Sequence, residues 1–145
     1  MLSDMIVTFC GHRQVENEDQ VRQWLENAVD GLIREGADVF YLGGYGGFDR
    51  MALTVVNKAK EVHTGVRAIL VLPYLDRSMD LDAYDGSVYP PLEKVPRRYA
   101  ISRRNRWMVD QADVVVAYVI HEWGGAATTL RYAEAKKKTI IRFPE

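Results

Sequence analysis

Short apolar runs alternate with amphipathic helical stretches along almost the whole chain. The helical stretches repeat apolar residues at i, i+3, i+4 and i+7, and they cover residues 17–35, 47–63, 97–111 and 128–138. The apolar runs predict strands at residues 5–10, 38–42, 67–72, 113–120 and 139–143. Almost wholly apolar strands that are separated by helices form parallel sheets with both faces covered. We therefore predict an α/β fold, a Rossmann-like doubly wound parallel sheet of about five strands with helices on both faces.

Nothing in the sequence divides these elements into separate units. The 145 residues contain no solenoid repeat, no low-complexity segment and no Gly/Ser-rich linker, so we predict one domain over residues 1–145. Residues 74–96 have three prolines and no clear period, which predicts a long loop. The single cysteine, and the absence of a signal peptide or membrane-spanning run at the sequence level, predict a cytoplasmic protein with no membrane partner. The formal net charge of −1 does not favour nucleic acid as a partner.

Three of the predicted strands are followed by glycine-containing segments. Ligands of doubly wound sheets bind outside the carboxyl ends of the strands, so these segments are expected to converge on one crevice. They are residues 11–13 after the first strand, 43–49 after the second, and 122–129 after the fourth. The predicted ligand-binding residues within them are Gly11, His12, Arg13, Gly44, Gly46, Gly47, Asp49, Gly124, Gly125, Ala126, Thr128 and Thr129.

The residue types in these segments are suited to a phosphorylated ligand. A glycine-rich turn before a helix lets backbone N–H groups converge on an anion, and threonine hydroxyls add donors. Arg13 is placed to form a phosphate fork. Asp49 could accept hydrogen bonds from a ribose or cap the second helix, and Thr128 could also serve as a cap. The pattern predicts a nucleotide-type ligand and requires no further cofactor.

A second group of basic residues lies on the helix before the fourth strand. At least two of these arginines are expected on a solvated helix face, while one or two could reach the crevice. Arginines beside an aromatic residue can also bind single-stranded nucleic acid. The residues are Arg97, Arg98, Arg103, Arg104 and Arg106, with Trp107 beside them.

Several common chemistries lack their sequence signals. The three histidines are far apart and have no metal-ligand spacing with Cys10, so we predict no metal site. The chain has no GxSxG elbow, no GxxxxGK[ST] loop and no GxGxxG after the first strand. These absences disfavour serine hydrolase, P-loop ATPase and standard dinucleotide dehydrogenase activities.

Four motifs together resemble a known superfamily. They are Phe-Cys-Gly-His-Arg at 9–13, Gly-x-x-Gly-Phe-Asp-x-x-Ala at 44–52, Arg-Asn-Arg-Trp-Met-Val-Asp at 104–110 and Gly-Gly-x-x-Thr at 124–128. In this order they resemble the YpsA-like proteins of the SLOG superfamily, and more distantly the DNA-processing protein A family. The resemblance implies a Rossmann-like fold whose crevice binds nucleotides or nucleotide-derived ligands of the ADP-ribose, NAD or cyclic ADP-ribose type. Related folds often pair, which implies a homodimer that uses Trp107, Met108 and the 74–96 loop.

The segment 124–128 is also similar to the Pro-Gly-Gly-x-Gly-Thr loop of the "lonely guy" phosphoribohydrolases. In that family a catalytic glutamate follows three residues later, where this chain has Arg131. The family's arginine on the preceding helix maps onto Arg104, so half of the catalytic pair is present. Hydrolysis would need another carboxylate, and Glu122 and Asp49 are the candidates.

Three functions therefore remain open at the level of sequence. The first is a binding module that acts as a sensor, carrier or sequestering protein. The second is an N-glycosidic hydrolase or ribosyltransferase that acts on a nucleoside monophosphate or an NAD-like substrate. The third is single-stranded DNA binding. The incomplete catalytic pair favours binding over turnover.

Overall fold

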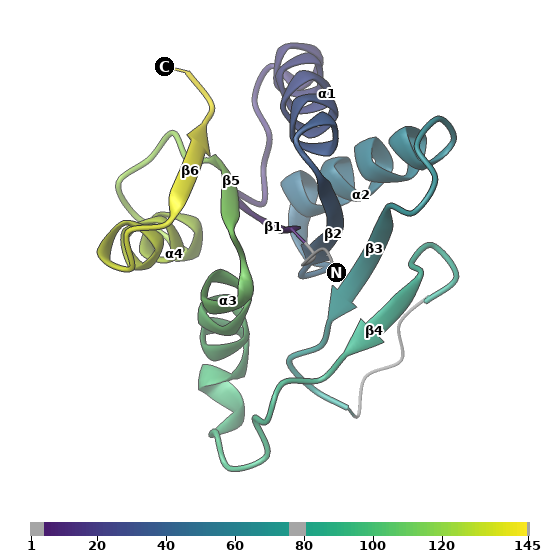
Figure 1. Ribbon diagram of the computed structural model, residues 1–145. Coiled ribbons are helices and arrows are strands. Elements are labelled where there is room, and N and C mark those ends of the chain that lie inside the picture. Colours follow the sequence, from purple (N-terminus) through teal and green to yellow (C-terminus); the bar gives the residue numbers. More distant parts are fainter. Residues whose placement is uncertain (1–4, 76–80, 145) are drawn as a thin grey trace.

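The computed structural model, which describes residues 5–75 and 81–144, contains a six-stranded, wholly parallel sheet (Figure 1). The strand order is β4-β3-β2-β1-β5-β6, so the direction of winding reverses between β1 and β5. This confirms the predicted doubly wound α/β fold. The strands are β1 (Met5–Gly11), β2 (Ala37–Leu42), β3 (Arg67–Val71), β4 (Gly86–Val88), β5 (Val114–Tyr118) and β6 (Thr139–Arg142).

Four helices cover the two faces of the sheet, α1 and α2 on one face and α3 and α4 on the other (Figure 1). Their bounds are α1 (Glu18–Arg34), α2 (Gly46–Lys60), α3 (Ala100–Gln111), which follows the short 3-10 helix η1 (Arg97–Tyr99), and α4 (Gly125–Ala135). In the described part of the chain, no helix has the length and apolar character needed to cross a bilayer.

The central strands are buried on both faces, which explains their continuous apolar sequence. Successive side chains of a strand point to opposite faces of the sheet. In β5, Val114, Val116 and Tyr118 pack into the core on the α1–α2 face, whereas Val115 and Ala117 pack into the core on the α3–α4 face. Each fully buried valine contributes on the order of 1.5–3 kcal/mol relative to an exposed one.

An aromatic cluster lies beneath the carboxyl ends of β1 and β5. The ring of Phe48 stacks on Tyr118 with centroids 5.6 Å apart, and it meets Phe9 edge-on at 6.4 Å. All three side chains are at most 3% exposed. Aromatic pairs of this geometry add about 0.5–1.5 kcal/mol each beyond the area that they bury. They give the crevice above them a rigid base.

The segment predicted as a long loop contains β4, a strand that was not predicted from the sequence. β4 pairs with β3 in parallel, with Ile69 opposite Gly86, and residues 76–80 of the predicted loop lie outside the described residues. Asp85 fixes the start of β4, because its Oδ2 accepts hydrogen bonds from Lys60 Nζ at 2.6 Å and from the Ala68 N–H at 2.7 Å. The strand has three residues, two of them Gly86 and Ser87, so it carries no apolar pattern that the sequence could reveal.

The predicted dimer residues on α3 are engaged within the protomer. Met108 is 4% exposed, and the Trp107 ring packs against Tyr41 with centroids 5.5 Å apart. Met108 therefore offers no surface to a partner.

Candidate functional site

The three glycine-containing segments meet around a cavity of about 390 Å³ near the point where the winding of the sheet reverses. Its walls come from the end of β1, one side of α3, the turn between β2 and α2 with the first turn of α2, and the first turn of α4 with the loop before it. The predicted ligand residues that line it are Gly11, His12, Arg13, Asp49, Arg104, Gly124, Gly125, Ala126 and Thr129. Among the described residues, the predicted members outside its lining are Gly44, Gly46, Gly47, Thr128 and Glu122.

Helix α4 presents its amino end to the cavity. It begins at Gly125, three residues before the predicted start, so the glycine-rich segment forms the first helical turn. Gly124 precedes it with φ +93°, a conformation that favours glycine. The N–H groups of Gly125, Ala126 and Ala127 have no acceptor among residues 5–75 and 81–144. These groups and the positive end of the helix dipole can bind an anion.

The threonine hydroxyls of this turn serve the helix itself. Thr128 Oγ1 donates to the Gly124 carbonyl at 3.1 Å, and Thr129 Oγ1 donates to the Gly125 carbonyl at 2.9 Å. The sequence had suggested these hydroxyls as extra donors to the anion. In the structure their protons are used within α4, and the backbone N–H groups remain as the donors.

The amino end of α2 is closed by the chain's own backbone. The Gly47 N–H donates to the Arg13 carbonyl at 2.7 Å, and the Phe48 N–H donates to the His12 carbonyl at 3.4 Å. A Cβ atom at Gly47 would lie 2.6 Å from the Arg13 carbonyl oxygen, and one at Gly46 would lie 3.1 Å from Arg13 Cα. Gly46 and Gly47 thus permit a close approach between two backbone segments. Both glycines therefore have a packing role, and the Gly47 N–H is used within the chain.

Arg104 is the one member of the arginine group that lines the cavity among the described residues. It is 2% exposed, and its Nη1 donates to the carbonyls of Gly43 at 2.9 Å and Val71 at 2.7 Å. Its Nε donates to Asn105 Oδ1 at 2.9 Å. Arg104 therefore connects α3 to the carboxyl ends of β2 and β3.

The other four arginines of the group do not line the cavity. Three of them lie over aromatic rings, with the guanidinium carbon 4.0–5.2 Å from the ring centroid: Arg97 over Tyr74, Arg98 over Tyr99 and Arg106 over Tyr132. Arg103 is exposed. This agrees with the expectation that at least two of these arginines are solvated and that one or two members reach the crevice.

Asp49 closes the turn between β2 and α2 from inside the first turn of the helix. Its carboxylate accepts hydrogen bonds from the backbone N–H groups of Tyr45, at 3.4 Å, and of Gly43 and Gly44. A Cβ atom at Gly43 would lie 2.9 Å from Asp49 Oδ2 and 3.0 Å from Arg104 Nη2, so both charged groups adjoin this glycine. Burial raises the pKa of Asp49 from 3.8 to about 6, although Arg104 and the backbone donors lower it.

The raised pKa predicts a pH dependence of stability that belongs to Asp49. The folded protein binds the Asp49 proton more tightly than the unfolded chain, so its contribution is complete below about pH 4 and is lost as the pH rises through about 6. The loss is up to about 3 kcal/mol. Urea unfolding between about pH 4 and pH 7 should show this decline in the unsubstituted protein but not in Asp49→Asn. The exposed-site variant Asp19→Asn should retain it, and equal slopes in all three proteins would contradict the assignment.

His12 anchors the loop that precedes α4. Its Nε2 accepts hydrogen bonds from the N–H groups of Ile120 at 2.9 Å and His121 at 3.3 Å, which requires an unprotonated Nε2. Burial and the neighbouring His121 lower the pKa of His12, so the neutral ring is favoured. A single side chain after β1 thus positions the wall formed by residues 119–124.

Trp123 is a cavity residue that the sequence did not identify as one. Its ring is stacked on His121 with centroids 4.5 Å apart and an interplanar angle of 16°, and the residue is 69% exposed. Large exposed aromatic rings beside a polar cavity offer a stacking surface to flat ligands. The signal was an aromatic residue directly before Gly124, which the sequence comparison treated only as a departure from the Pro-Gly-Gly-x-Gly-Thr loop.

The two candidate catalytic carboxylates lie in different places. Asp49 lines the cavity, whereas Glu122 is exposed and lines a neighbouring hollow with Glu134 and Arg142. The Glu122 carbonyl accepts a hydrogen bond from Arg131 at 3.1 Å, so Arg131 holds this loop from the outside. Asp49 is therefore the carboxylate of this pair that can act on a ligand in the cavity. Among the described residues, no group of three His, Cys, Asp or Glu side chains could hold a metal ion.

The fold is shared with proteins of known structure. No family model matches the chain, and no curated protein matches its sequence. The structure is similar to DNA processing protein A from Streptococcus pneumoniae, with a TM-score of 0.73 and 20% identity over 98% of this chain and 51% of that one. It is also similar to DNA processing protein A from Helicobacter pylori, with a TM-score of 0.67 and 19% identity over 97% of this chain and 66% of that one.

A third similar structure is the Moco carrier protein of Chlamydomonas rheinhardtii, with a TM-score of 0.57 and 19% identity over 97% of this chain and 76% of that one. The chain spans about half and just under two thirds of the two DNA-processing chains. At these identities the similarity shows the fold alone, and that fold is the Rossmann-like α/β fold predicted from the sequence.

Proposed function

We propose that this protein binds a nucleotide or nucleotide-derived phosphate ligand in the cavity and acts as a sensor, carrier or sequestering protein. The observation that carries the proposal is the open amino end of α4, whose first three N–H groups have no acceptor among the described residues and whose first two residues line a cavity beside an exposed aromatic ring. A phosphate group satisfies those donors without any rearrangement of the helix. The flat base of the ligand would stack on Trp123.

The remaining cavity residues provide both a hydrogen-bond donor and a hydrogen-bond acceptor for the ligand. Arg13 lies at the rim as an exposed cation, and Asp49 offers a carboxylate that can accept hydrogen bonds from ribose hydroxyls. A cavity of about 390 Å³ falls within the range of small-molecule sites. The structural similarity to a carrier protein fits a binding role, although the identity of the ligand does not transfer between the two chains.

Substitution of Trp123 tests the stacking contact. Titration calorimetry with AMP, ADP-ribose, NAD and cyclic ADP-ribose should detect binding by the unsubstituted protein, and Trp123→Ala should bind about tenfold more weakly. Tyr99→Ala is the matched control, because Tyr99 is 50% exposed but lies outside the cavity. An absence of heat with every ligand at sub-millimolar concentrations would reject the proposed function.

The position of Asp49 favours a second candidate, N-glycosidic hydrolysis or ribosyl transfer. A cavity carboxyl with a pKa of about 6 can exchange a proton near neutral pH, and its anion can stabilise an oxocarbenium-like ribosyl centre. The same nucleotides, incubated with the protein and separated by chromatography, distinguish the two candidates. Release of free base would establish turnover, and intact nucleotides after long incubation would leave binding as the function.

Single-stranded DNA binding is supported less well. The Helicobacter pylori protein has a single-stranded DNA binding mode, and its chain extends well beyond the part that this chain matches. Here Arg104 lines the cavity, three other arginines of the group lie over separate aromatic rings, and Arg103 is exposed, so the group is divided among different places.

A further inference from the structure

A second hollow of about 610 Å³ adjoins the cavity, between the amino ends of α1 and α2. Its lining includes three arginines, Arg13, Arg22 and Arg50, together with Glu16 and Glu18. Arg13 lines both the cavity and the hollow, so a ligand that extends past Arg13 enters the hollow. None of the site residues expected from the sequence, except Arg13 and Gly47, belongs to it.

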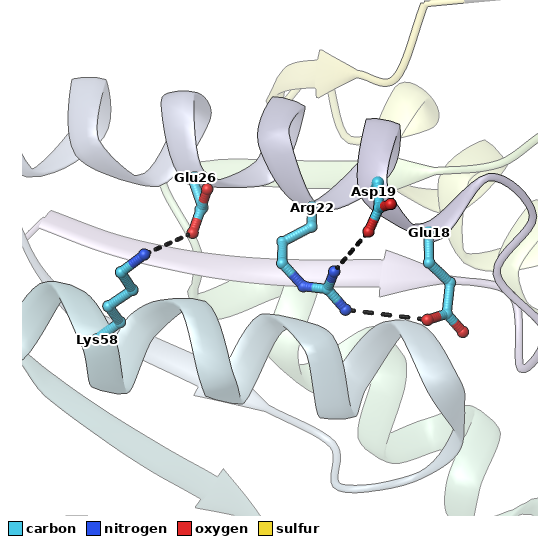
Figure 2. Close-up of polar contacts among 5 residues, drawn as sticks. All are labelled: Glu18, Asp19, Arg22, Glu26 and Lys58. Atoms are coloured by element: carbon cyan, nitrogen blue, oxygen red, sulfur yellow. Dashed lines mark hydrogen bonds and ion pairs between the residues drawn. The ribbon is translucent and has the colours of Figure 1, made fainter.

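One of the three arginines is already neutralised. Figure 2 shows Arg22 directed from α1 toward α2, with Nη1 3.3 Å from Asp19 Oδ1 and Nη2 3.9 Å from Glu18 Oε2. The next ion pair along these helices, between Lys58 and Glu26 at 3.2 Å, ties α2 to α1 (Figure 2). Arg13 and Arg50 form no ion pair with any residue in 5–75 or 81–144.

The backbone fixes the positions of these two arginines. The first turn of α2 holds Arg13 through the Gly47 hydrogen bond, and a Cβ atom at Gly46 would lie 3.2 Å from Arg13 Cγ. Arg50 follows Gly46 by four residues and therefore lies on the same side of α2. The Arg13 and His12 carbonyls occupy the N–H groups of Gly47 and Phe48, so the amino end of α2 offers neither of these donors to the hollow, and its cationic donors are guanidinium groups. Guanidinium groups bind phosphate and carboxylate groups through paired hydrogen bonds.

We propose that Arg13 and Arg50 form a second anion subsite, and that the ligand carries two anionic groups separated by a spacer. One group binds at the amino end of α4 and the other binds between Arg13 and Arg50. This inference rests on the proposed function, and it assigns the ligand to the class of dinucleotides and bisphosphates. Glu16 and Glu18 also line the hollow, and Asp19 is paired with Arg22 beside it, so these carboxylates repel further negative charge and the subsite takes one additional anionic group and not a long nucleic acid strand.

The test compares AMP with the 5′-phosphorylated dinucleotide pApA by titration calorimetry. We expect pApA to bind about tenfold more tightly than AMP, with a steeper decrease in affinity as the salt concentration rises. Arg50→Gln should reduce pApA affinity to that of AMP and leave AMP affinity unchanged. Arg34→Gln removes the same charge at the far end of α1, where Arg34 is paired with Asp30, and should change neither affinity.

The outcomes separate this inference from the proposed function. Equal affinities for AMP and pApA, or an equal loss for both ligands in Arg50→Gln, would overturn the second subsite and leave nucleotide binding intact. A failure of both ligands to bind would reject the proposed function itself. Thermal unfolding of each variant verifies that it is folded, and the exposed position of Arg50 predicts little change.

Discussion

Replacement of Arg104 by alanine is expected to lower the free energy of unfolding by about 3–5 kcal/mol. The guanidinium group is buried and donates to the carbonyls of Gly43 and Val71, which would both lose this partner at the ends of β2 and β3. Asp49 would also lose the neighbouring cation that partly offsets its burial. Urea unfolding at neutral pH measures the change as a lower midpoint with a similar slope.

Arg103 provides a matched control on the same helix. It is exposed, so Arg103→Ala should change stability by no more than about 0.5 kcal/mol. Arg104→Lys retains the charge but replaces the planar fork with a single ammonium group, so its stability should lie between those of the unsubstituted protein and Arg104→Ala. Equal stabilities of Arg103→Ala and Arg104→Ala would show that the buried contacts do not stabilise the site.

A methyl group at Gly11 is expected to destabilise the protein by about 1–3 kcal/mol, the usual cost of overpacking a core. A Cβ atom there would overlap the ring of Phe48 and would lie 2.8 Å from Phe48 Cβ. Phe48 is fully buried and cannot retreat without disturbing its contacts with Phe9 and Tyr118. Thermal or urea unfolding of Gly11→Ala measures the effect.

Gly31 is a control position at which a glycine-to-alanine substitution meets no neighbouring atoms. It lies within α1, and a Cβ atom there has no neighbour within 4 Å. Gly31→Ala should therefore stabilise the protein by up to about 1 kcal/mol through helix propensity. In a double-mutant cycle, Phe48→Leu should recover part of the loss in Gly11→Ala, and purely additive effects would show that the Phe48 ring is not the cause.

The regular elements were predictable because their signals are local. Apolar runs located five of the six strands, and the helical period located the four α-helices, with small differences at their ends. α4 was placed three residues too late because glycines and alanines at 124–127 lack an apolar period, although they form its first turn. β4 was missed because its three residues are held by pairing with β3, and because Lys60 and the Ala68 N–H hold Asp85, the residue before it. Such contacts leave no local pattern.

The meeting of the three glycine-containing segments around one cavity was predictable, but the different structural roles of these segments were not. The rule that ligands bind at the carboxyl ends of strands brought the three segments together correctly. It could not show that the amino end of α2 is closed by Arg13 and His12 while that of α4 is open, since both follow glycine-rich turns. Nor could charge pattern distinguish Arg104 from Arg103, because which helix face is buried depends on packing against β2 and β3.

The strand order also sets the sequence in which a growing chain can assemble. Strand β1 meets β2 early, since 33 residues separate the hydrogen-bonded pair Thr8 and Tyr41. Its other neighbour arrives much later, because 107 residues separate Ile6 from Asp113 beside β5. During synthesis from the amino end, one edge of β1 therefore stays open while β2 and β3 join the other. The cavity needs the first turn of α4 as well, so it forms only after α4 has been made. A ligand that bound in this cavity would therefore stabilise chains in which α4 has folded, by mass action, while shorter nascent chains would gain nothing from it.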